Sequence, residues 1–385
     1  MTGGGTDGRP DQSPGYDVIG DVHGHADKLV ALLARLGYDE RDGVWRHHTR
    51  QAVFVGDLID RGPDQSACVR IARSMVDDGA ARVVMGNHEF NAIAFHTPAG
   101  EGGYLRPHTK KNRAQHAAFL DQVGFDTAES RDIVGWFETL PLWLTLSLPS
   151  ATGDGTGTGT EGRHRRRPRG TPGGHRRAHD GDRDTDVAGG DGPGSGAGAG
   201  AGSSPTATLR VVHACWSQSA IDVLSGPLAA CAGMRGDVLR SAATKGSAEW
   251  HAVEHLLKGP EVAVPEPYRD KGGHVRHHAR FRWWDPDALT LRSATLIPGG
   301  TTDLDGNPYP GLPDTPIGPP VAPYDDPIPV LYGHYWETGE CAVSGSRTAC
   351  VDYSAGKDGP LVAYRWTGEA DLTAANYVRS DDPQP

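Results

Sequence analysis

The sequence predicts an α/β fold, because short apolar segments alternate with segments of helical period over the first 150 residues. Residues 16–20 form the first apolar segment and indicate a buried strand. Leucines follow at positions 29, 32, 33 and 36, which is the spacing of one face of a helix, and Gly37 stands where a left-handed residue commonly ends one. Strands and helices in alternation predict a sheet with both faces covered.

The same alternation continues along the chain. Residues 52–55 and 82–85 indicate two further strands, and between them we expect a helix from Pro63 to Gly79. Residues 209–212 and 328–332 also have the composition of strands. Residues 350–353 and 361–366 predict a late β pair around a glycine-rich turn.

A long polar segment separates the two groups of strands. Residues 151–206 contain no aromatic side chain and Val187 as the only large aliphatic one, so this segment cannot bury enough surface to offset the entropy of ordering. We expect a disordered insertion. Its basic half, residues 163–177, precedes an acidic run at 180–186, which favours a solvated loop. A nucleic-acid-binding or partner-binding arm is the alternative.

The chain therefore divides into five expected parts. These are a disordered tail over 1–14, the first part of a core over 15–150, the insertion over 151–206, the second part of the core over 207–370, and a C-terminal tail over 371–385. The second part of the core includes an irregular Pro-rich stretch over 298–329.

Composition and charge exclude several classes of function. Lys and Arg number 38 against 49 Asp and Glu, so the net charge of −11 disfavours general binding to nucleic acid or to a membrane surface. No apolar run reaches the ~20 residues of a spanning helix, and residues 1–14 lack the basic start and apolar core of a signal peptide. We therefore expect a cytoplasmic location. Five scattered cysteines without a CxxC pair argue against a disulfide framework and a structural zinc site.

Polar residues follow five of the expected strands. They are Asp21 and His23 after the first, Asp57 after the second, Asn87 after the third, and His213 and His334 after two later strands. Ligands of α/β sheets bind beyond the carboxyl ends of the strands, so we expect these side chains to meet at one edge. Oxygen and imidazole donors without thiolates suit Mn²⁺, Fe or Zn²⁺.

These motifs resemble those of the calcineurin-like metallophosphoesterases. The segments are GDVHG at 20–24, GDLIDRGP at 56–63, GNHE at 86–89 and RFRWWDP at 280–286, with the late Gly333-His334. The resemblance is strongest to the phosphoprotein-phosphatase branch, and within it to uncharacterised bacterial members. It implies a four-layer α/β/β/α sandwich. The sequence departs from the pattern where His213-Ala214-Cys215-Trp216 replaces His-Ala-Gly, and we expect Cys215 and Trp216 to narrow the pocket.

The resemblance implies a site for two divalent metal ions, Mn²⁺ first, with Fe or Zn²⁺ as alternatives. Asp21 and His23 would hold the first ion, Asp57 would bridge both, and Asn87, His213 and His334 would complete the second. Two ions ~3.5–4 Å apart turn a shared water into hydroxide near neutral pH and stabilise the charge on a phosphate as it is attacked.

Four further residues acquire roles from the same resemblance. His88 would protonate the leaving oxygen, and Asp60 would orient His88. Arg61 would bind phosphate oxygens, and Glu89 would pair with Arg61 and orient its guanidinium. For Asp60, Arg61 and Glu89, the alternative is an ion-pair network that only stabilises the loops.

Other residues are candidates for contact with the substrate. Arg106, Arg280 and Arg282 are candidate substrate-side cations, with ordinary ion-paired arginines as the alternative. Trp283, Trp284 and Trp336 would either wall a pocket or pack in the core.

The leading functional hypothesis is a binuclear-metal phosphoesterase acting on phosphomonoesters, including phosphoprotein Ser/Thr. A dinucleoside-polyphosphate hydrolase is the alternative enzyme, and a scaffold that binds nucleic acid or a partner through the basic insertion is the non-enzymatic one. The expected partner is a phosphorylated substrate, a phosphoprotein or a nucleotide, and neither membrane nor nucleic acid. The sequence leaves the oligomeric state open.

Overall fold

The computed structural model describes residues 13–100, 102–149, 206–270, 273–317 and 323–383. The expected insertion, apart from Thr206, and most of the expected N-terminal tail lie outside these residues. Two mixed β-sheets form the centre of the described chain. None of the helices described is both long enough and apolar enough to cross a bilayer.

The first sheet is built around the N-terminal strands. Its order is β14 (Tyr377–Arg379), β13 (Val362–Trp366), β1 (Gly15–Ile19), β4 (Arg50–Phe54) and β5 (Ala81–Val83). β1, β4 and β5 run parallel, so their carboxyl ends lie at one edge of the sheet. These three strands begin and end within two residues of the sequence-based expectation.

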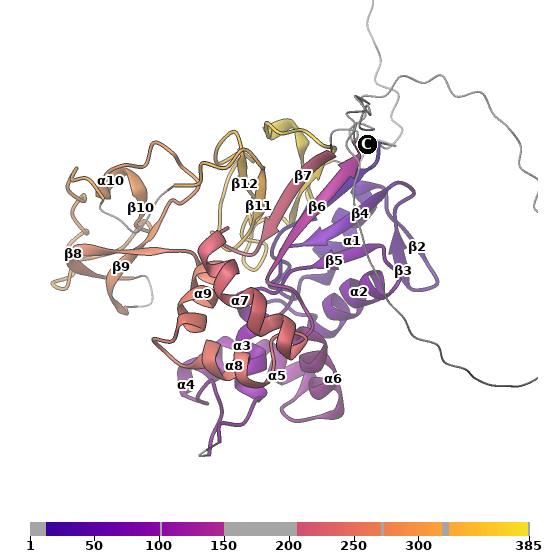
Figure 1. The fold of residues 1–385 in the computed structure, drawn as a ribbon, viewed down its shortest axis with the longest axis horizontal. Helices are drawn as coiled ribbons and strands as arrows, with labels where there is room; N and C mark the ends of the chain where they lie inside the picture. The colour runs from indigo at the N-terminus through magenta and orange to yellow at the C-terminus, as the bar shows by residue number, and fades with distance from the viewer. Residues whose placement is uncertain (1–12, 101, 150–205, 271–272, 318–322, 384–385) are drawn as a thin grey trace, which may run out of the picture. The chain divides into compact units, whose positions relative to one another are not determined.

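The second sheet combines strands from both sides of the expected insertion. Its order is β12 (Thr348–Cys350), β11 (Val330–Tyr332), β7 (Thr206–Val212) and β6 (Trp143–Pro149). β7, β11 and β12 are parallel, so their carboxyl ends also share an edge. β6 and β7 are neighbours, as Figure 1 shows, although 56 residues separate their ends in the sequence.

The two sheets pack face to face through an apolar layer. Alternate side chains of β1 and β4, such as Val18 and Val53, form one buried cluster with Val211 of β7 and Leu331 of β11. The residues next to them, such as Ile19 and Tyr332, point to the opposite faces and belong to a second cluster. This period-two division is what two stacked sheets require.

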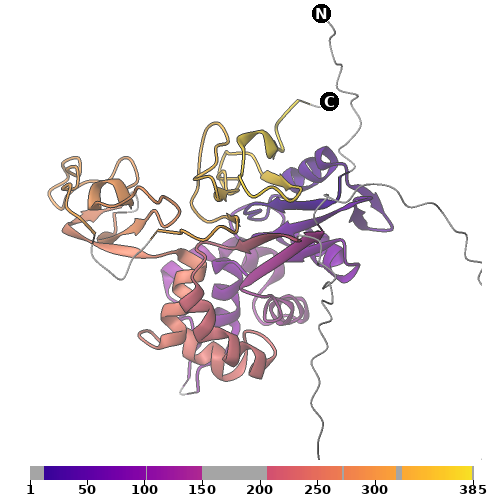
Figure 2. The same ribbon diagram turned by 45° about the horizontal axis from the view of Figure 1, so that its top comes forward.

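Helices make up much of the rest of the described chain. They are α1 (Ala26–Leu36), α2 (Gln65–Asp77), α3 (Asn87–His96), α4 (Lys110–Gln115), α5 (Ala117–Val123), α6 (Ala128–Phe137), α7 (Gln218–Cys231), α8 (Gly236–Ala243), α9 (Ala248–Lys258) and α10 (Leu291–Ala294), with a 3₁₀ turn at Ala374–Asn376. The leucine face of α1 is buried, and Gly37 ends the helix at φ 87° as expected. Figures 1 and 2 show helices on both sides of the stacked sheets, which confirms the predicted four-layer sandwich.

The prediction for the end of the chain was wrong in one respect. β12 and β13 do not pair with each other, because β12 lies in the second sheet and β13 in the first. Both segments are apolar on both faces. Such a pattern predicts a buried strand but does not indicate which strand it pairs with. β14 also pairs with β13, so regular structure continues beyond residue 371, where the sequence analysis expected a tail.

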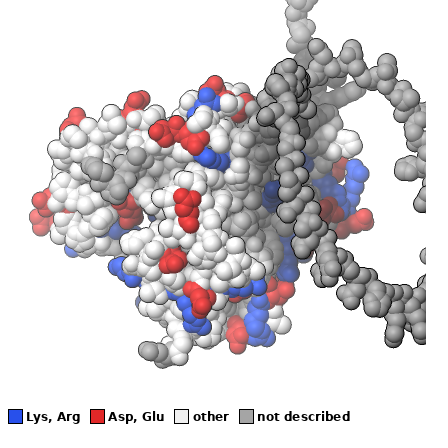
Figure 3. Space-filling model, in the orientation of Figure 1, with Lys and Arg blue, Asp and Glu red and all other residues white. Residues whose placement is uncertain are grey.

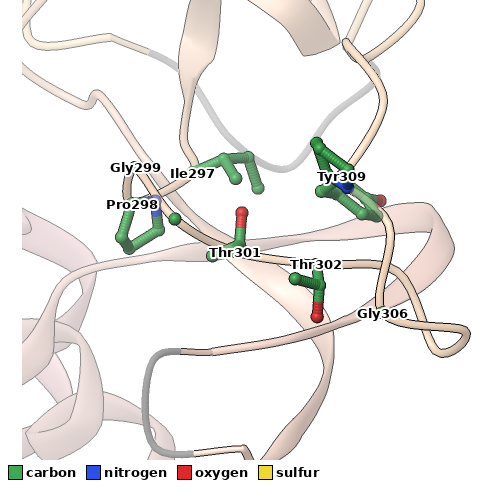
Figure 4. A pocket seen from close by; sticks show the side chains of 9 residues that line it. Ile297, Pro298, Gly299, Thr301, Thr302, Gly306 and Tyr309 are labelled. Atoms are coloured by element: carbon green, nitrogen blue, oxygen red, sulfur yellow. The ribbon is translucent and has the colours of Figure 1, made fainter.

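Two smaller sheets extend the core. β8 (Glu261–Arg269), β9 (Val275–Phe281) and β10 (Thr295–Leu296) form one, and β2 (Asp39–Arg41) pairs with β3 (Val44–Arg46) in the other. A cavity of about 420 Å³ follows β10, where Ile297, Thr301 and Tyr309 surround it (Figure 4). Its lining contains no Asp, Glu, His, Lys or Arg.

Acidic and basic side chains are interspersed on the face drawn in Figure 3.

A buried ion pair supports the start of the first sheet. Arg50 Nε donates to Asp17 Oδ1 at 2.8 Å, and both side chains are fully buried. The Tyr38 hydroxyl donates to Asp17 Oδ2 at 3.1 Å, and Arg50 also donates to the carbonyl oxygen of Trp366 at 3.0 Å. The pair thus connects β1, β4 and β13.

Removing one charge of this pair should destabilise the fold. Asp17→Ala leaves a buried guanidinium without its carboxylate, so the free energy of unfolding should fall by about 3–5 kcal/mol. Urea denaturation followed by circular dichroism measures this loss. The double variant Asp17→Leu/Arg50→Met should lose less than Asp17→Ala, because it leaves only Arg365, and not both Arg50 and Arg365, without this carboxylate. A fall below about 1 kcal/mol for Asp17→Ala would contradict the assigned role.

Candidate active site

The polar residues predicted at the strand ends meet at the adjoining edges of the two sheets. Asp21, Asp57 and Asn87 follow β1, β4 and β5, and His213 and His334 follow β7 and β11. Backbone hydrogen bonds join these loops: the carbonyl oxygen of Asp57 accepts from His23 N at 2.8 Å, and that of His213 accepts from Gly333 N at 2.8 Å. The structure thus brings together the loops that carry these residues.

Several loop residues adopt backbone conformations that residues other than glycine rarely take. Positive φ angles occur at His23 (48°), Asp57 (49°), Asp60 (69°), Arg61 (76°) and His334 (74°). Such conformations cost about 1–3 kcal/mol each and cluster at functional sites. Gly333 is required for space, because a Cβ there would lie 2.1 Å from Asp21 Oδ1.

His23 presents a free ring nitrogen to Asp57. Its Nδ1 donates to the carbonyl oxygen of Ile59 at 3.0 Å, which fixes the tautomer. Its Nε2 lies 3.6 Å from Asp57 Oδ2, is buried, and has no hydrogen-bond partner among the described residues. Burial lowers the pKa of His23 to about 3, so the imidazole is neutral and able to act as a ligand.

His213 makes the matching approach from the second sheet. Its Nδ1 donates to the carbonyl oxygen of Val55 at 2.8 Å, and its Nε2 lies 3.2 Å from Asn87 Oδ1 and 3.6 Å from Asp57 Oδ1. The ring of His334 lies 5.1 Å from that of His213. The two oxygens of Asp57 therefore face His23 and His213 separately.

The donor set fits divalent cations. Two groups of side chains bring their donor atoms within 4.8 Å of one another, namely His23, Asp57 and His88, and Asp57, His213 and His334. Asp57 belongs to both. Burial, together with the negative charges of Asp352 and Asp57, raises the pKa of Asp21, and cations beside it would favour its ionised form. Asp21 stands outside both groups, and its carboxylate accepts from the backbone N–H of His334 at 3.2 Å.

Asp60 holds two histidines, one on each oxygen. Oδ2 lies 2.6 Å from His88 Nδ1, and Oδ1 lies 2.9 Å from His116 Nδ1. Burial disfavours the charge on His88, but the carboxylates of Asp57 and Asp60 outweigh it and raise the pKa of His88 above its ordinary value. Asp60 itself is ionised, because burial raises its pKa less than the hydrogen bonds from His116 and His88 lower it. These carboxylates therefore favour the protonated form of His88.

Glu89 does not pair with Arg61, so that expectation was wrong. Glu89 is fully buried and accepts from the backbone N–H groups of Asp57 at 2.8 Å, Leu58 at 2.8 Å and Gly86 at 2.9 Å. It stands at the third position of α3, where a glutamate reaches back to the start of its own helix. Arg61 instead lies 4.2 Å from the ring centre of Trp336.

The three other candidate arginines lie in different surroundings. Arg280 Nη1 and Arg282 Nε are buried without a hydrogen-bond partner among the described residues, and the charge of Arg280 lowers the pKa of His334, after the larger effect of burial. Arg106 donates to Asn91 Oδ1 and to Gln115 Oε1, the latter at 2.7 Å. Arg280 thus acts electrostatically on His334 of the second group, and Asn91 and Gln115 hold the guanidinium of Arg106.

The tryptophans divide between core and site. Trp283 and Trp284 are buried, and Trp283 Nε1 donates to the carbonyl oxygen of Ala214 at 3.0 Å. Trp336 stacks on His23 with ring centres 5.4 Å apart. Cys215 and Trp216, expected to narrow the substrate pocket, are buried and line a cavity of about 330 Å³ whose lining includes none of the expected metal ligands.

Sequence reasoning missed two residues of this site. His116 carries no motif, since it lies between the short helices α4 and α5. Asp352 follows β12 by two residues and could have been found, because the other acidic residues of the site also follow strands. It was instead read as part of a strand over 350–353. Its oxygens accept from Trp336 N at 2.8 Å and from Ser354 N at 3.0 Å.

Comparison with known proteins places this geometry in a family. The sequence profile of the calcineurin-like phosphoesterases matches residues 16–211, which is more than half of the 385 residues. An asymmetrical bis(5'-nucleosyl)-tetraphosphatase PrpE of Bacillus velezensis is 45% identical over 74 residues, or 19% of this chain and 30% of the relative. A symmetrical bis(5'-nucleosyl)-tetraphosphatase of Hamiltonella defensa is 44% identical over 80 residues, or 20% of this chain and 26% of the relative.

These matches span less than a third of each relative's length. A crystal structure of a putative diadenosine tetraphosphatase covers 96% of both chains at 13% identity and a TM-score of 0.37. The family profile covers β1 through β7, and so includes the loops that carry Asp21, Asp57 and Asn87. The chain therefore belongs to the calcineurin-like phosphoesterase family of metal-dependent hydrolases.

Proposed function

We propose that the protein hydrolyses phosphomonoesters with the help of two divalent cations, and that phosphorylated Ser or Thr side chains are among its substrates. The position of the Asp57 carboxylate is the observation that supports this most. Its oxygens lie 3.6 Å from His23 Nε2 and 3.6 Å from His213 Nε2, as a carboxylate shared by two cations would.

The proposed ligands divide into two sets. Asp21, His23 and Asp57 would hold one cation, and Asp57, Asn87, His213 and His334 the other. When bound, the cations activate a water and neutralise charge on the phosphate. Oxygen and imidazole donors favour Mn²⁺, with Fe or Zn²⁺ as alternatives. Backbone carbonyl oxygens fix the tautomers of His23 and His213, so that Nε2 of each points inward.

His88 would protonate the leaving oxygen. A positioned acid matters most for a poor leaving group, such as the alkoxide of a phosphoserine, so it favours alkyl phosphates such as phosphoserine over substrates with good leaving groups. Asp60 would keep His88 charged and oriented through its 2.6 Å contact with Nδ1. His116 would hold the other oxygen of Asp60 and so stop the carboxylate from rotating.

Two arginines would bind the phosphate. Arg61 is exposed at the edge of the site, and its guanidinium has no hydrogen-bond partner among the described residues. Arg280 is half-buried and carries an unpartnered Nη1. Planar guanidinium groups match phosphate oxygens in pairs. Arg282 would assist Arg280, whereas Arg106 is occupied by Asn91 and Gln115.

A dinucleoside-polyphosphate hydrolase is the second candidate. It is favoured by the names of the relatives, whose matched segments are 44–45% identical to this chain. The experiment that separates the two compares Mn²⁺-dependent hydrolysis of p-nitrophenyl phosphate, a phosphoserine peptide and diadenosine tetraphosphate. Turnover of the tetraphosphate alone would replace the proposed function by the second candidate.

Asp57→Asn should abolish turnover and lower the metal content of the purified protein. A neutral amide cannot balance two cations as the carboxylate does. Metal analysis by mass spectrometry and p-nitrophenyl phosphate hydrolysis measure both effects. Full occupancy with normal turnover would exclude the two-cation site.

His88→Asn should slow the reaction according to the leaving group. The rate for a serine phosphate should fall by roughly 10²–10⁴-fold, while the rate for p-nitrophenyl phosphate falls less, because that leaving group needs less protonation. Metal content should stay unchanged. His213→Asn serves as the contrast, since it should lose metal and both activities together. Equal losses on the two substrates for His88→Asn, with metal retained, would remove the role of acid.

His116→Phe should give a milder form of the same pattern. The phenyl ring can keep the stacking on Phe119, whose ring centre lies 4.8 Å from that of His116, but it cannot donate to Asp60. The rate for phosphoserine should fall by roughly 10–100-fold, and that for p-nitrophenyl phosphate by less.

Two variants control this prediction. His116→Asn restores a donor near the position of Nδ1 and should recover part of the rate. His96→Phe changes a ring 5.7 Å from His116 that makes no described contact with Asp60, and it should leave the leaving-group dependence unaltered. An equal loss on both substrates for His116→Phe would reduce His116 to a packing residue.

A further inference from the structure

Two exposed cations flank one aromatic ring beside the site. The Arg61 guanidinium carbon lies 4.2 Å from the ring centre of Trp336, and Lys357 Nζ lies 4.5 Å from it. Trp336 also stacks on His23 at 5.4 Å. Both cations therefore stand close to the place where the reacting phosphate would bind.

Neither cation has an acidic partner. Among the described residues, the side chains of Arg61 and Lys357 form no salt bridge and no hydrogen bond. Asp352 interacts electrostatically with Arg61, but it is buried, and backbone N–H groups of Trp336 and Ser354 occupy its oxygens. Glu337 and Asp358 adjoin Trp336 and Lys357 in the sequence, and neither is among the salt bridges of the described residues. Two cations without an acidic partner thus lie against one ring, in a chain of net charge −11. This arrangement favours the binding of an anion.

The turn that carries Lys357 is held in place. Ser354 O accepts from Lys357 N at 2.9 Å and from Gly359 N at 3.2 Å, which closes the turn. Lys28 Nζ on α1 donates to three carbonyl oxygens of this turn, those of Ala355 at 2.8 Å, Gly359 at 2.9 Å and Lys357 at 3.3 Å. Such a clamp keeps the Lys357 backbone fixed although its side chain is exposed.

The turn also packs directly on the site. A Cβ at Gly356 would lie 2.7 Å from His23 Cδ2 and 2.9 Å from Arg61 Cδ, so only glycine allows this approach. Trp336 takes a positive φ of 57° and Ser354 one of 62° to complete the arrangement. The fold thus fixes the ring of Trp336 and the backbone of the turn that carries Lys357.

We propose that Arg61, Trp336 and Lys357 form a subsite for a second phosphate group, carried by the leaving group of the substrate. Arg61 contacts the reacting phosphate and the second one, and Lys357 contacts the second alone. Preferred substrates are phosphomonoesters that bear a further phosphate near the scissile bond. The inference rests on the proposed function, since it assumes that the reacting phosphate binds beside His23.

The test measures binding and not turnover. Titration calorimetry on the Mn²⁺-loaded full chain compares methylphosphonate, which has one phosphonate, with methylene-, ethylene- and propylene-diphosphonate, which cannot be hydrolysed. The wild-type chain should bind at least one diphosphonate about tenfold more tightly than methylphosphonate. The spacing that binds best measures the distance between the two phosphate positions.

Variants of Lys357 test whether the preference for a diphosphonate depends on this residue. Lys357→Met should weaken the best diphosphonate about tenfold and methylphosphonate by less than twofold, and Lys357→Arg should keep most of the diphosphonate affinity. Lys245→Met, an exposed lysine between α8 and α9, is the matched control and should change neither. Equal affinity of the wild-type chain for one and two phosphonates would overturn the proposal. So would equal weakening of both ligands by Lys357→Met.

The two proposals fail separately. Absence of p-nitrophenyl phosphate hydrolysis, with a diphosphonate preference that depends on Lys357, would overturn the proposed function and leave the subsite standing. Hydrolysis of p-nitrophenyl phosphate without that preference would overturn the subsite alone.

Discussion

The buried carboxylate and carbonyl of Asp57 organise the loops of this site. The carbonyl oxygen accepts from Val22 N at 3.1 Å and from His23 N at 2.8 Å, which ties the loop after β1 to the loop after β4. Oδ1 accepts from His88 N at 2.9 Å, which attaches the start of α3. Glu89 supports the same loop by accepting from Asp57 N. One residue thus joins three strand ends.

Charge is arranged in two zones around Asp57. The carboxylates of Asp21, Asp57, Glu89 and Asp352 are buried, and burial raises the pKa of Glu89 to about 7 and that of Asp352 to about 6. Cations in the interior would favour the ionised forms, because an opposite charge nearby lowers the pKa of a carboxyl group. Arg61, Arg280 and Lys357 carry positive charge around this zone, where it would attract and orient phosphate.

Much of the fold and the metal-binding region could be predicted from local patterns. Short apolar runs predicted β1, β4 and β5, and the spacing of leucines predicted α1. The polar site residues were predicted because each one stands just after an expected strand. The late strands were harder. β12 and β13 were expected to pair and lie in different sheets, because an apolar strand is compatible with any buried neighbour. Glu89 was expected to pair with Arg61 and instead accepts from backbone N–H groups at the start of its own helix and in the loop after β4.

The sequence by itself determined the kinds of donor, their order along the chain and the strand after which each one stands, since these depend on neighbouring residues. Only the tertiary structure decided which oxygen of Asp57 faces which histidine, that His116 shares Asp60, and that Lys357 reaches the ring of Trp336. His116 lies 56 positions from Asp60, and Lys357 lies 21 positions from Trp336. Contacts of this kind leave no periodic trace in a sequence, because strand pairing and loop packing create them only when distant segments meet.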